Sequence, residues 1–108
     1  MERKFLGKIT SAEFGSHRDY PFMFGILLTF AFEGSVCDCG AKYAVNIHKD
    51  CKWTVEQRAE ACMESIDKIH EILEAANCLY LSELVNKPVE ITLDGDLFKD
   101  FRILTEVI

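Results

Sequence analysis

The chain ends in Lys87-Pro-Val-Glu-Ile-Thr-Leu-Asp-Gly-Asp-Leu-Phe-Lys-Asp-Phe-Arg-Ile-Leu-Thr-Glu-Val-Ile108, and this stretch decides its fold. Apolar and polar residues alternate on both sides of Asp94-Gly95, and several of them are β-branched. Such alternation is typical of half-buried strands, and Asp-Gly supplies the positive φ that a tight turn requires. The sequence therefore predicts a C-terminal β-hairpin.

Three further strands are predicted before this hairpin, at Phe5–Phe14, Phe22–Phe32 and Val36–His48, the last interrupted at Gly40. The run Phe22–Phe32 is almost continuously apolar, which suits a long central strand buried on both faces, or on one face and in an oligomer interface. A helix is the alternative for this run. Pro21 on one side and Glu33-Gly34 on the other favour the strand.

One helix is predicted with clear boundaries, from Thr54 to about Asn77. Thr54 and Gln57 have the spacing of a capping box, which satisfies two free backbone N–H groups at a helix start. The helix carries one apolar stripe, which we expect to pack on the sheet: Ala59, Cys62, Met63, Ile66, Ile69, Leu73 and Ala76.

A short helical turn is expected at 80–85, before the hairpin. The element order is then βββ-α-ββ, so the fold class is α+β, an antiparallel sheet packed against one main amphipathic helix. With 108 residues and no linker, the chain is predicted to be a single domain, 1–108.

The charge of the chain limits its partners. The net charge is −6, and the segment Thr54–Asn77 carries six acidic residues against only Arg58 and Lys68. Binding to long nucleic acids relies mainly on Lys and Arg at the phosphates, so a nucleic-acid polymer is not expected as a partner. A small anion can still bind where Lys and Arg gather.

The sequence also predicts where in the cell the protein is found and whether it is an enzyme. The longest apolar stretch, Pro21–Phe32, is too short to span a bilayer. Five cysteines with no regular framework and no signal peptide indicate a cytoplasmic protein with free thiols, away from membranes. Familiar catalytic motifs are absent from the sequence, so neither an enzyme nor a cofactor is predicted.

A zinc site is the sharpest alternative to a metal-free protein. Cysteine thiolates and imidazole are ligands that zinc prefers, and the sequence offers Cys37, Cys39, His48 and Cys51. Their spacing matches none of the common zinc modules. Cys37 and Cys39 would lie on one strand face, so packing as small buried apolar residues is the favoured interpretation.

Ligand binding is better indicated by clusters of cations and rings, at His17–Phe22 and Phe98–Arg102, and by a polar set in the loop after the helix. Rings or guanidinium planes stack on bases, and Arg donors bind phosphates. The ligand-binding candidates are Arg18, Tyr80, Asn86 and Arg102. Ordinary roles compete: Arg18 as a charged turn residue, Asn86 as a capping residue, and Phe98 and Phe101 as core residues.

The C-terminal block also resembles that of small phage and prophage proteins that end in variants of "KPVEVTF-(D/E)-G-N…RILTEV". Two other segments are similar to this family, "KITSAEFG" followed by "FGILLTF", and Trp53-Thr54 with Arg58 at the helix entry. The family is identified as the first described Thoeris inhibitors, which are phage anti-defence proteins. Two segments depart from the family pattern, the turn at Gly15–Pro21 and Cys37-Asp-Cys39.

The resemblance implies a function. Those proteins sequester a cyclic ADP-ribose signal without cleaving it, form homo-oligomers and act in the infected bacterial cell, and related ones also hold cyclic oligonucleotides. The implied roles are phosphate binding for Arg102, stacking for Tyr80 and polar recognition for Asn86. The rival interpretation is a phage protein that inhibits a host defence protein through its acidic helix, Glu56 to Glu74.

Overall fold

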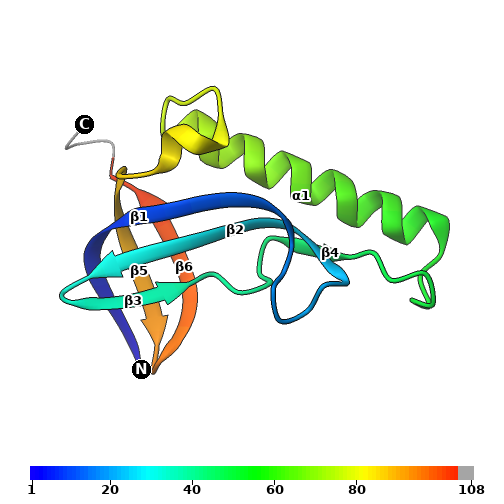
Figure 1. The fold of residues 1–108 in the computed structure, drawn as a ribbon, viewed down its shortest axis with the longest axis horizontal. Coiled ribbons are helices and arrows are strands. Elements are labelled where there is room, and N and C mark those ends of the chain that lie inside the picture. Colours follow the sequence, from blue (N-terminus) through cyan, green and yellow to red (C-terminus); the bar gives the residue numbers. More distant parts are fainter. Residues whose placement is uncertain (105–108) are drawn as a thin grey trace.

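The computed structural model describes residues 1–104, which form an antiparallel sheet and one main helix (Figure 1). This α+β fold is the predicted class. The elements are β1 (Glu2–Ser16), β2 (Met23–Phe32), β3 (Ser35–Asp38), β4 (Ala44–Asn46), α1 (Val55–Ala75), the 3₁₀ helix η1 (Leu81–Leu84), β5 (Pro88–Asp94) and β6 (Leu97–Ile103). The last four residues of the predicted hairpin, 105–108, lie outside the described residues.

The long strand β1 organises the sheet. The strand order is β3-β2-β1-β5-β6, and β4 pairs with the other end of β2. The first half of β1, up to Lys8, pairs with β5, and the second half pairs with β2. The pairing with β2 begins at Lys8, and it contains a bulge between Ile9 and Ser11. Because bulges bend a strand and increase its twist, the sheet curls around its own apolar face.

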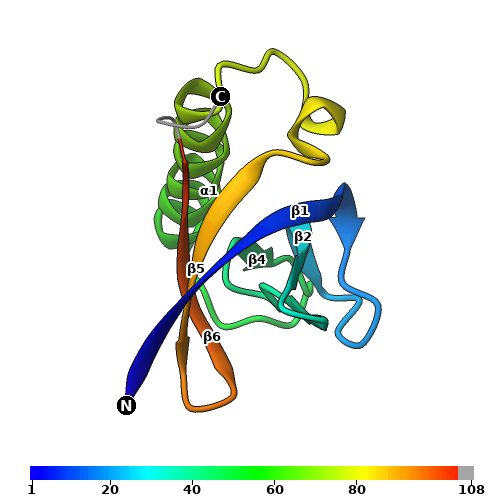
Figure 2. The same cartoon turned by 90° about the vertical axis from the view of Figure 1, so that its left-hand side faces the viewer.

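The core lies inside this curled sheet and is centred on Phe30. Phe30 is fully buried, and its ring centroid lies 5.3 Å from that of Phe98 and 5.1 Å from that of Phe101. These ring contacts pack β6 against β2, although β1 and β5 lie between the two strands in the sheet. The helix α1 runs along one side of the curl, as Figures 1 and 2 show.

The predicted C-terminal hairpin is present as β5 and β6. Gly95 has φ 63°, the conformation for which glycine was expected at this turn. The turn is displaced by one residue from the prediction, because Asp94 still pairs with Leu97 and the connecting residues are Gly95 and Asp96. The N-terminal amine of Met1 lies 3.1 Å from the carboxylate of Asp94, which places the chain start beside this turn.

The strands before the helix differ from the prediction in length. The first strand is longer, Glu2–Ser16. The third is replaced by the two short strands β3 and β4, on either side of a turn in which Gly40 has φ 57°. The prediction of an interruption at Gly40 is confirmed. Both short strands lie along one edge of β2.

The start of α1 is as predicted. The backbone N–H of Gln57 donates to the Thr54 hydroxyl at 3.1 Å, and the Gln57 side chain accepts from the Thr54 N–H at 3.0 Å. This is the complete capping box. The short helical turn expected at 80–85 is present as η1.

The predicted packing of the apolar helix stripe is wrong for its N-terminal half. Ile72 and Ala76 are buried, but Met63 is 64% exposed and Ile66 is 58% exposed. Figure 1 shows the reason: α1 projects beyond the strands at its N-terminal end. There the side of α1 that faces the sheet carries Ser65. Its hydroxyl donates to the carbonyl of Tyr43, the residue before β4, at 3.2 Å.

Within residues 1–104, α1 is too polar to cross a membrane, and the remaining helical segment is a single short turn.

Candidate functional site

A groove runs between α1 and the strands packed against it. Its first part, about 360 Å³, lies between α1 and β4. Its second part, about 260 Å³, lies between α1 and β6. Lys68 borders both parts. We call them together the α1 groove. Its size falls within the few hundred Å³ typical of small-ligand sites.

Basic side chains border the groove along its length. Lys42 and Lys68 border the first part, and Lys68 and Arg102 border the second. Glu64 and Glu71 also border it, and the Lys68 ammonium lies 3.8 Å from the Glu71 carboxylate. The lining therefore suits an anion that is held by cations at separated points.

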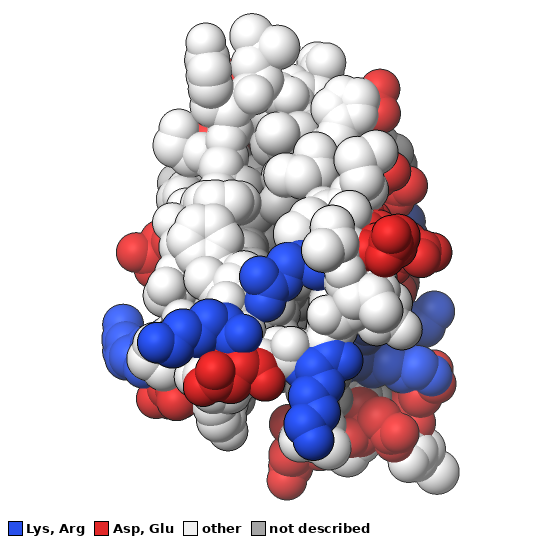
Figure 3. Space-filling view, turned by 90° about the vertical axis from the view of Figure 1, so that its right-hand side faces the viewer, with Lys and Arg blue, Asp and Glu red and all other residues white. Residues whose placement is uncertain are grey.

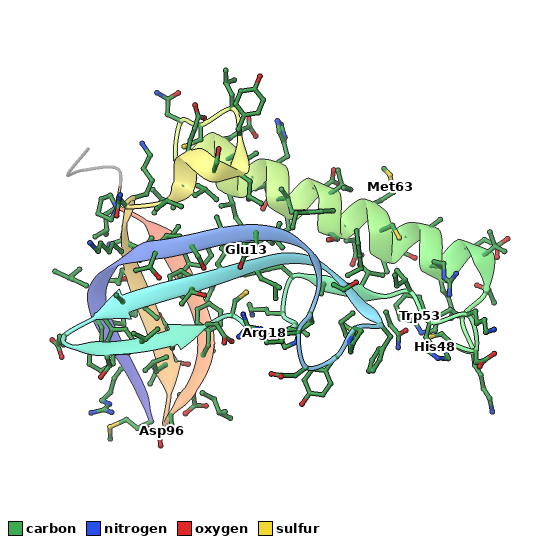
Figure 4. All side chains as sticks on the ribbon, in the orientation of Figure 1. Glu13, Arg18, His48, Trp53, Met63 and Asp96 are labelled. Carbon is green, nitrogen blue, oxygen red and sulfur yellow. The ribbon has the colours of Figure 1, made fainter. Side chains whose placement is uncertain are left out.

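An indole ring stands at one end of the groove. Trp53 borders the first part and is 38% exposed. It lies in the segment between β4 and α1, next to His48, below the start of the helix (Figure 4). A partly exposed indole offers a flat apolar face, which is the surface on which a nucleobase stacks.

The segment that carries Trp53 is held at its start, at Ile47 and His48. The Arg58 guanidinium of α1 donates to the His48 carbonyl at 2.9 Å. The N–H of Ile47 donates to the Phe22 carbonyl at 2.8 Å, and the rings of Phe22 and His48 lie 6.4 Å apart, edge to face. These contacts join the start of the segment to the β1–β2 loop and to the helix.

The lining is suited to binding more than to covalent chemistry. The hydroxyl of Ser65 already donates to the Tyr43 carbonyl, and the Asn46 side-chain oxygen accepts the N–H of His48 at 2.9 Å. A serine nucleophile needs a neighbouring base to take its proton. Here the serine proton is engaged in a structural hydrogen bond.

Tyr43 borders the groove but is only 5% exposed. Its hydroxyl has no hydrogen-bond partner in the described part of the chain. Burial raises the pKa of this hydroxyl well above its ordinary value of 10.0, and the nearby Asp100 carboxylate raises it further. Tyr43 is therefore held neutral, with its ring packed edge to face on Phe101 at 6.2 Å.

Two effects are expected from Tyr43→Phe. Removing a buried hydroxyl without a partner should increase the free energy of unfolding by about 1 kcal/mol. Because the pKa of this hydroxyl is higher in the native state than in the unfolded chain, its effect on stability is constant below pH 10. The free energy of unfolding falls as the pH rises above 10, since the unfolded chain ionises first. Above pH 10, the free energy of unfolding of the wild type should fall by about 1.4 kcal/mol more per pH unit than that of the variant.

Urea unfolding of wild type and Tyr43→Phe, each followed at neutral pH and above pH 10, measures both effects. The comparison cancels the titration of other groups, because these are shared. If the free energies of unfolding of wild type and variant change in parallel across this pH range, the raised pKa of Tyr43 is contradicted. Tyr20→Phe, at a ring that is 53% exposed, is the matched control for the loss of a hydroxyl and should change the free energy of unfolding at neutral pH by no more than about 0.5 kcal/mol.

The structure places the four predicted ligand-binding residues in three locations. Arg102 borders the groove, and its Nε lies 3.0 Å from the Glu90 carboxylate. Arg18 lies in the β1–β2 loop and borders a separate small hollow with Glu13 and Asp38. With Asp19, three carboxylates border that hollow and make it unfavourable for an anion.

Tyr80 and Asn86 flank η1. Tyr80 is 68% exposed, and its N–H, together with that of Leu79, is bound by the Glu83 carboxylate. These bonds lower the pKa of Glu83. Asn86 has φ 74°, and its N–H donates to the Ile9 carbonyl at 2.7 Å. Asparagine tolerates this left-handed conformation better than most residues, so the chain turn already explains it.

The four candidate zinc ligands are not gathered. Within residues 1–104, no group of three or more His, Cys, Asp or Glu side chains is placed to hold a metal ion. Cys39 is buried in the core, where its sulfur accepts the N–H of Leu28 at 3.3 Å. Burial is also the main reason that the pKa of Cys39 is raised. The packing role is the one that the structure shows for Cys39.

Sequence reasoning did not identify Trp53, Lys42 or Lys68 as ligand-binding candidates. Two signals were present. Trp53 is the single tryptophan of the chain, and Lys68 is one of only two cations in the acidic helical segment. Neither signal pointed to a groove, because the groove exists only once β4, α1 and β6 are packed together.

Comparison of this chain with models of protein families, with curated proteins and with solved structures finds no match.

Proposed function

We propose that this protein binds and sequesters a small cyclic nucleotide signal in the α1 groove, without cleaving it. The observation that carries the proposal is the position of Lys68, which borders both parts of the groove. A molecule bound beside Lys68 can meet Trp53 and Lys42 in the first part, or Arg102 in the second. Rings on the base and cations on the phosphates are the usual means of holding a nucleotide.

The resemblance of the C-terminal block gives this proposal its biological setting. It makes the protein a phage anti-defence factor that acts in the cytoplasm of the infected bacterium. The first ligand to test is then a cyclic ADP-ribose isomer, followed by cyclic oligonucleotides. We also expect a homo-oligomer. Depleting a scarce signal requires a Kd on the order of nanomolar, or about −12 kcal/mol.

Fluorescence of Trp53 tests the proposal directly, because the chain has no other tryptophan. Titration with cyclic ADP-ribose isomers and with cyclic di- and trinucleotides should change the emission and raise the melting temperature. Ligand at about 100 times Kd adds about 2.7 kcal/mol of stability. Chromatography of the ligand after heating the complex should recover it intact.

Each other outcome of this experiment has a defined meaning. A cleaved product would replace sequestration with catalysis. A shift in melting temperature with no change in Trp53 emission would place the ligand away from the α1 groove. If none of the nucleotides changes either signal, nucleotide sequestration is refuted and the second function below takes its place.

A second function is favoured by the acidic side of α1, which adjoins the groove at Glu64 and Glu71. Six carboxylates of this helix are exposed: Glu56, Glu60, Glu64, Asp67, Glu71 and Glu74. We propose as the alternative that this acidic side contacts a basic surface of a host defence protein and inhibits it. Charged surfaces of this kind steer association and set specificity.

Charge reversal separates the two functions. Glu64 and Glu71 border the groove, so the test uses Glu60→Lys with Asp67→Lys, which lie outside its lining. If the acidic side binds a protein, this double variant should lose capture of the host protein about tenfold or more. Nucleotide affinity should change by no more than a few fold, because exposed charges are screened.

The matched control reverses two exposed carboxylates elsewhere, with Glu13→Lys and Asp96→Lys, which are labelled in Figure 4. The control changes the net charge by the same amount and should retain the host protein. Equal loss of capture in both double variants would show that total charge, and not the acidic side of α1, is responsible.

A further inference from the structure

A hollow of about 380 Å³ lies at the end of the sheet where β1 begins. It is bordered by the start of β1, the β2–β3 turn and the β5–β6 turn, and it shares no lining residue with the α1 groove. In Figure 1 the two turns lie toward the left and lower left, whereas Figure 3 shows the opposite end of the molecule, where α1 begins. We call it the end hollow, and its defining residues are Arg3, Phe5, Phe32, Glu33, Leu93 and Asp96.

The less exposed residues around the end hollow are apolar. The rings of Phe5 and Phe32 lie with their centroids 4.9 Å apart, and both residues pack against the core. Leu93 belongs to the core and is 7% exposed. Aromatic rings pack favourably on other rings in offset or edge-to-face arrangements. This part of the hollow therefore suits a small aromatic group.

A guanidinium stands beside these rings, on the core-facing side of the sheet. Residues that pair in an antiparallel ladder present their side chains on the same side. Arg3 pairs with the buried Leu93, and Phe5 pairs with the fully buried Ile91, so Arg3 and Phe5 share the core-facing side of β1. The guanidinium carbon of Arg3 lies 5.4 Å from the centroid of the Phe5 ring. Within residues 1–104 no carboxylate forms an ion pair with Arg3, so its N–H donors can bind a ligand carboxylate.

Two carboxylates complete the border of the end hollow, those of the exposed residues Glu33 and Asp96. Glu33 and Gly34 form the two-residue turn between β2 and β3, and their φ angles are 48° and 78°. Asparagine or aspartate before glycine is preferred in such a turn, because a short polar side chain tolerates the left-handed conformation. The turn itself therefore does not explain a glutamate at position 33. Residues held in a disfavoured backbone conformation are concentrated at binding sites.

We infer that the end hollow binds a free amino acid with an aromatic side chain. The side chain of this ligand lies on the rings of Phe5 and Phe32. Its α-carboxylate accepts from the Arg3 guanidinium, and its α-ammonium faces the carboxylates of Glu33 and Asp96. The inference does not rest on the proposed nucleotide function, because the two sites have no lining residue in common.

The charges around the end hollow favour this ligand over simpler ones. Two carboxylates repel a plain anion, and the guanidinium repels a plain cation. A residue inside a peptide chain carries neither backbone charge, and a residue at a chain end carries only one. A free amino acid carries both charges on one carbon atom, next to its side chain. Its size also fits, because hollows of a few hundred Å³ are typical of small-ligand sites.

Isothermal titration calorimetry of the full chain with three matched ligands tests the inference. L-Phenylalanine carries both charges, phenethylamine lacks the carboxylate, and hydrocinnamate lacks the ammonium. L-Phenylalanine should bind with a Kd on the order of 1 mM or below. Each of the other two should bind at least about tenfold more weakly, because each loses a hydrogen bond between charged groups.

Replacing the guanidinium identifies its partner on the ligand. Arg3→Gln should weaken the binding of L-phenylalanine at least about tenfold, and it should not weaken the binding of phenethylamine, which has no carboxylate. Arg18→Gln is the matched control. Arg18 is also exposed but does not border the end hollow, so this variant should bind L-phenylalanine within a few fold of the wild type.

A second variant fills the end hollow without changing its charges. Ser35 is exposed, borders the hollow and pairs with Phe32, so its side chain lies on the same side of the sheet. Ser35→Phe should therefore abolish the binding of L-phenylalanine. Circular dichroism shows that each variant is folded, and all three replaced residues are exposed, so the core is left intact.

The inference is overturned if L-phenylalanine does not bind, or if all three ligands bind equally well, since the charges then play no part. It is also overturned if Arg3→Gln binds L-phenylalanine as tightly as Arg18→Gln does, or if Ser35→Phe still binds it, because the ligand then lies elsewhere. Nucleotide binding is measured separately by Trp53 fluorescence. A protein that binds L-phenylalanine and no nucleotide refutes the proposed function alone, and the reverse result refutes this inference alone.

Discussion

Phe30→Ala should lower the free energy of unfolding by about 3–5 kcal/mol, a large share of the total stability of a small domain. Phe30 is fully buried near the end of β2 and contacts the rings of Phe98 and Phe101. Truncation removes both ring contacts and leaves a cavity that the two strands cannot easily close. Since these rings join β2 to β6, we expect the curl of the sheet to loosen first.

Urea unfolding followed by circular dichroism measures this loss, and Phe22→Ala is its matched control. Phe22 is 40% exposed just before β2, so the same side-chain change there should cost about 1 kcal/mol or less. Similar losses at Phe22 and Phe30 would show that the centre of the core lies elsewhere.

Replacing Lys68 and Arg102 together by alanine should weaken nucleotide binding at least about a hundredfold. Hydrogen bonds to charged groups contribute about 1.5–3 kcal/mol each, and every 1.4 kcal/mol is a factor of ten. Lys68 borders both parts of the α1 groove, and Arg102 closes its second part. The double variant therefore removes cations from two separated points of the ligand.

Titration of Trp53 emission measures this loss, and Lys8→Ala with Lys49→Ala is the control. Both control residues are exposed, neither borders the groove, and the change in net charge is identical. The control should bind the nucleotide within a few fold of the wild type. If the two double variants bind equally well, the ligand does not lie in the groove.

The features that the sequence predicted correctly depend on near neighbours. The capping box needs only Thr54 and Gln57, and the C-terminal turn needs only a glycine between two alternating runs. The packing of the apolar helix stripe was predicted wrongly for a different reason. Periodicity identifies the apolar flank of α1, but which part of it meets the sheet depends on where the strands end. At the N-terminal end of α1 the strands end before Met63 and Ile66.

The residues of the candidate site were likewise predicted only in part. Arg102 could be selected from the sequence because it alternates with Phe101 on a predicted strand. Trp53 and Lys68 could not be grouped with it, because they come from the β4–α1 segment and the middle of α1. Asn86 was selected as a polar ligand residue, whereas the structure shows a backbone reason for asparagine there, its φ of 74°.

The division of β1 between two partners also determines how the chain can be assembled. The second half of β1 pairs with β2, which follows it closely in the chain, so this hairpin can form early. The first half pairs with β5, whose residues are made about eighty positions later, and such distant pairings are slow to form. During synthesis residues 2–8 therefore remain an unpaired strand edge until β5 is made. A partner bound to that edge before the last strands leave the ribosome would prevent the sheet from closing.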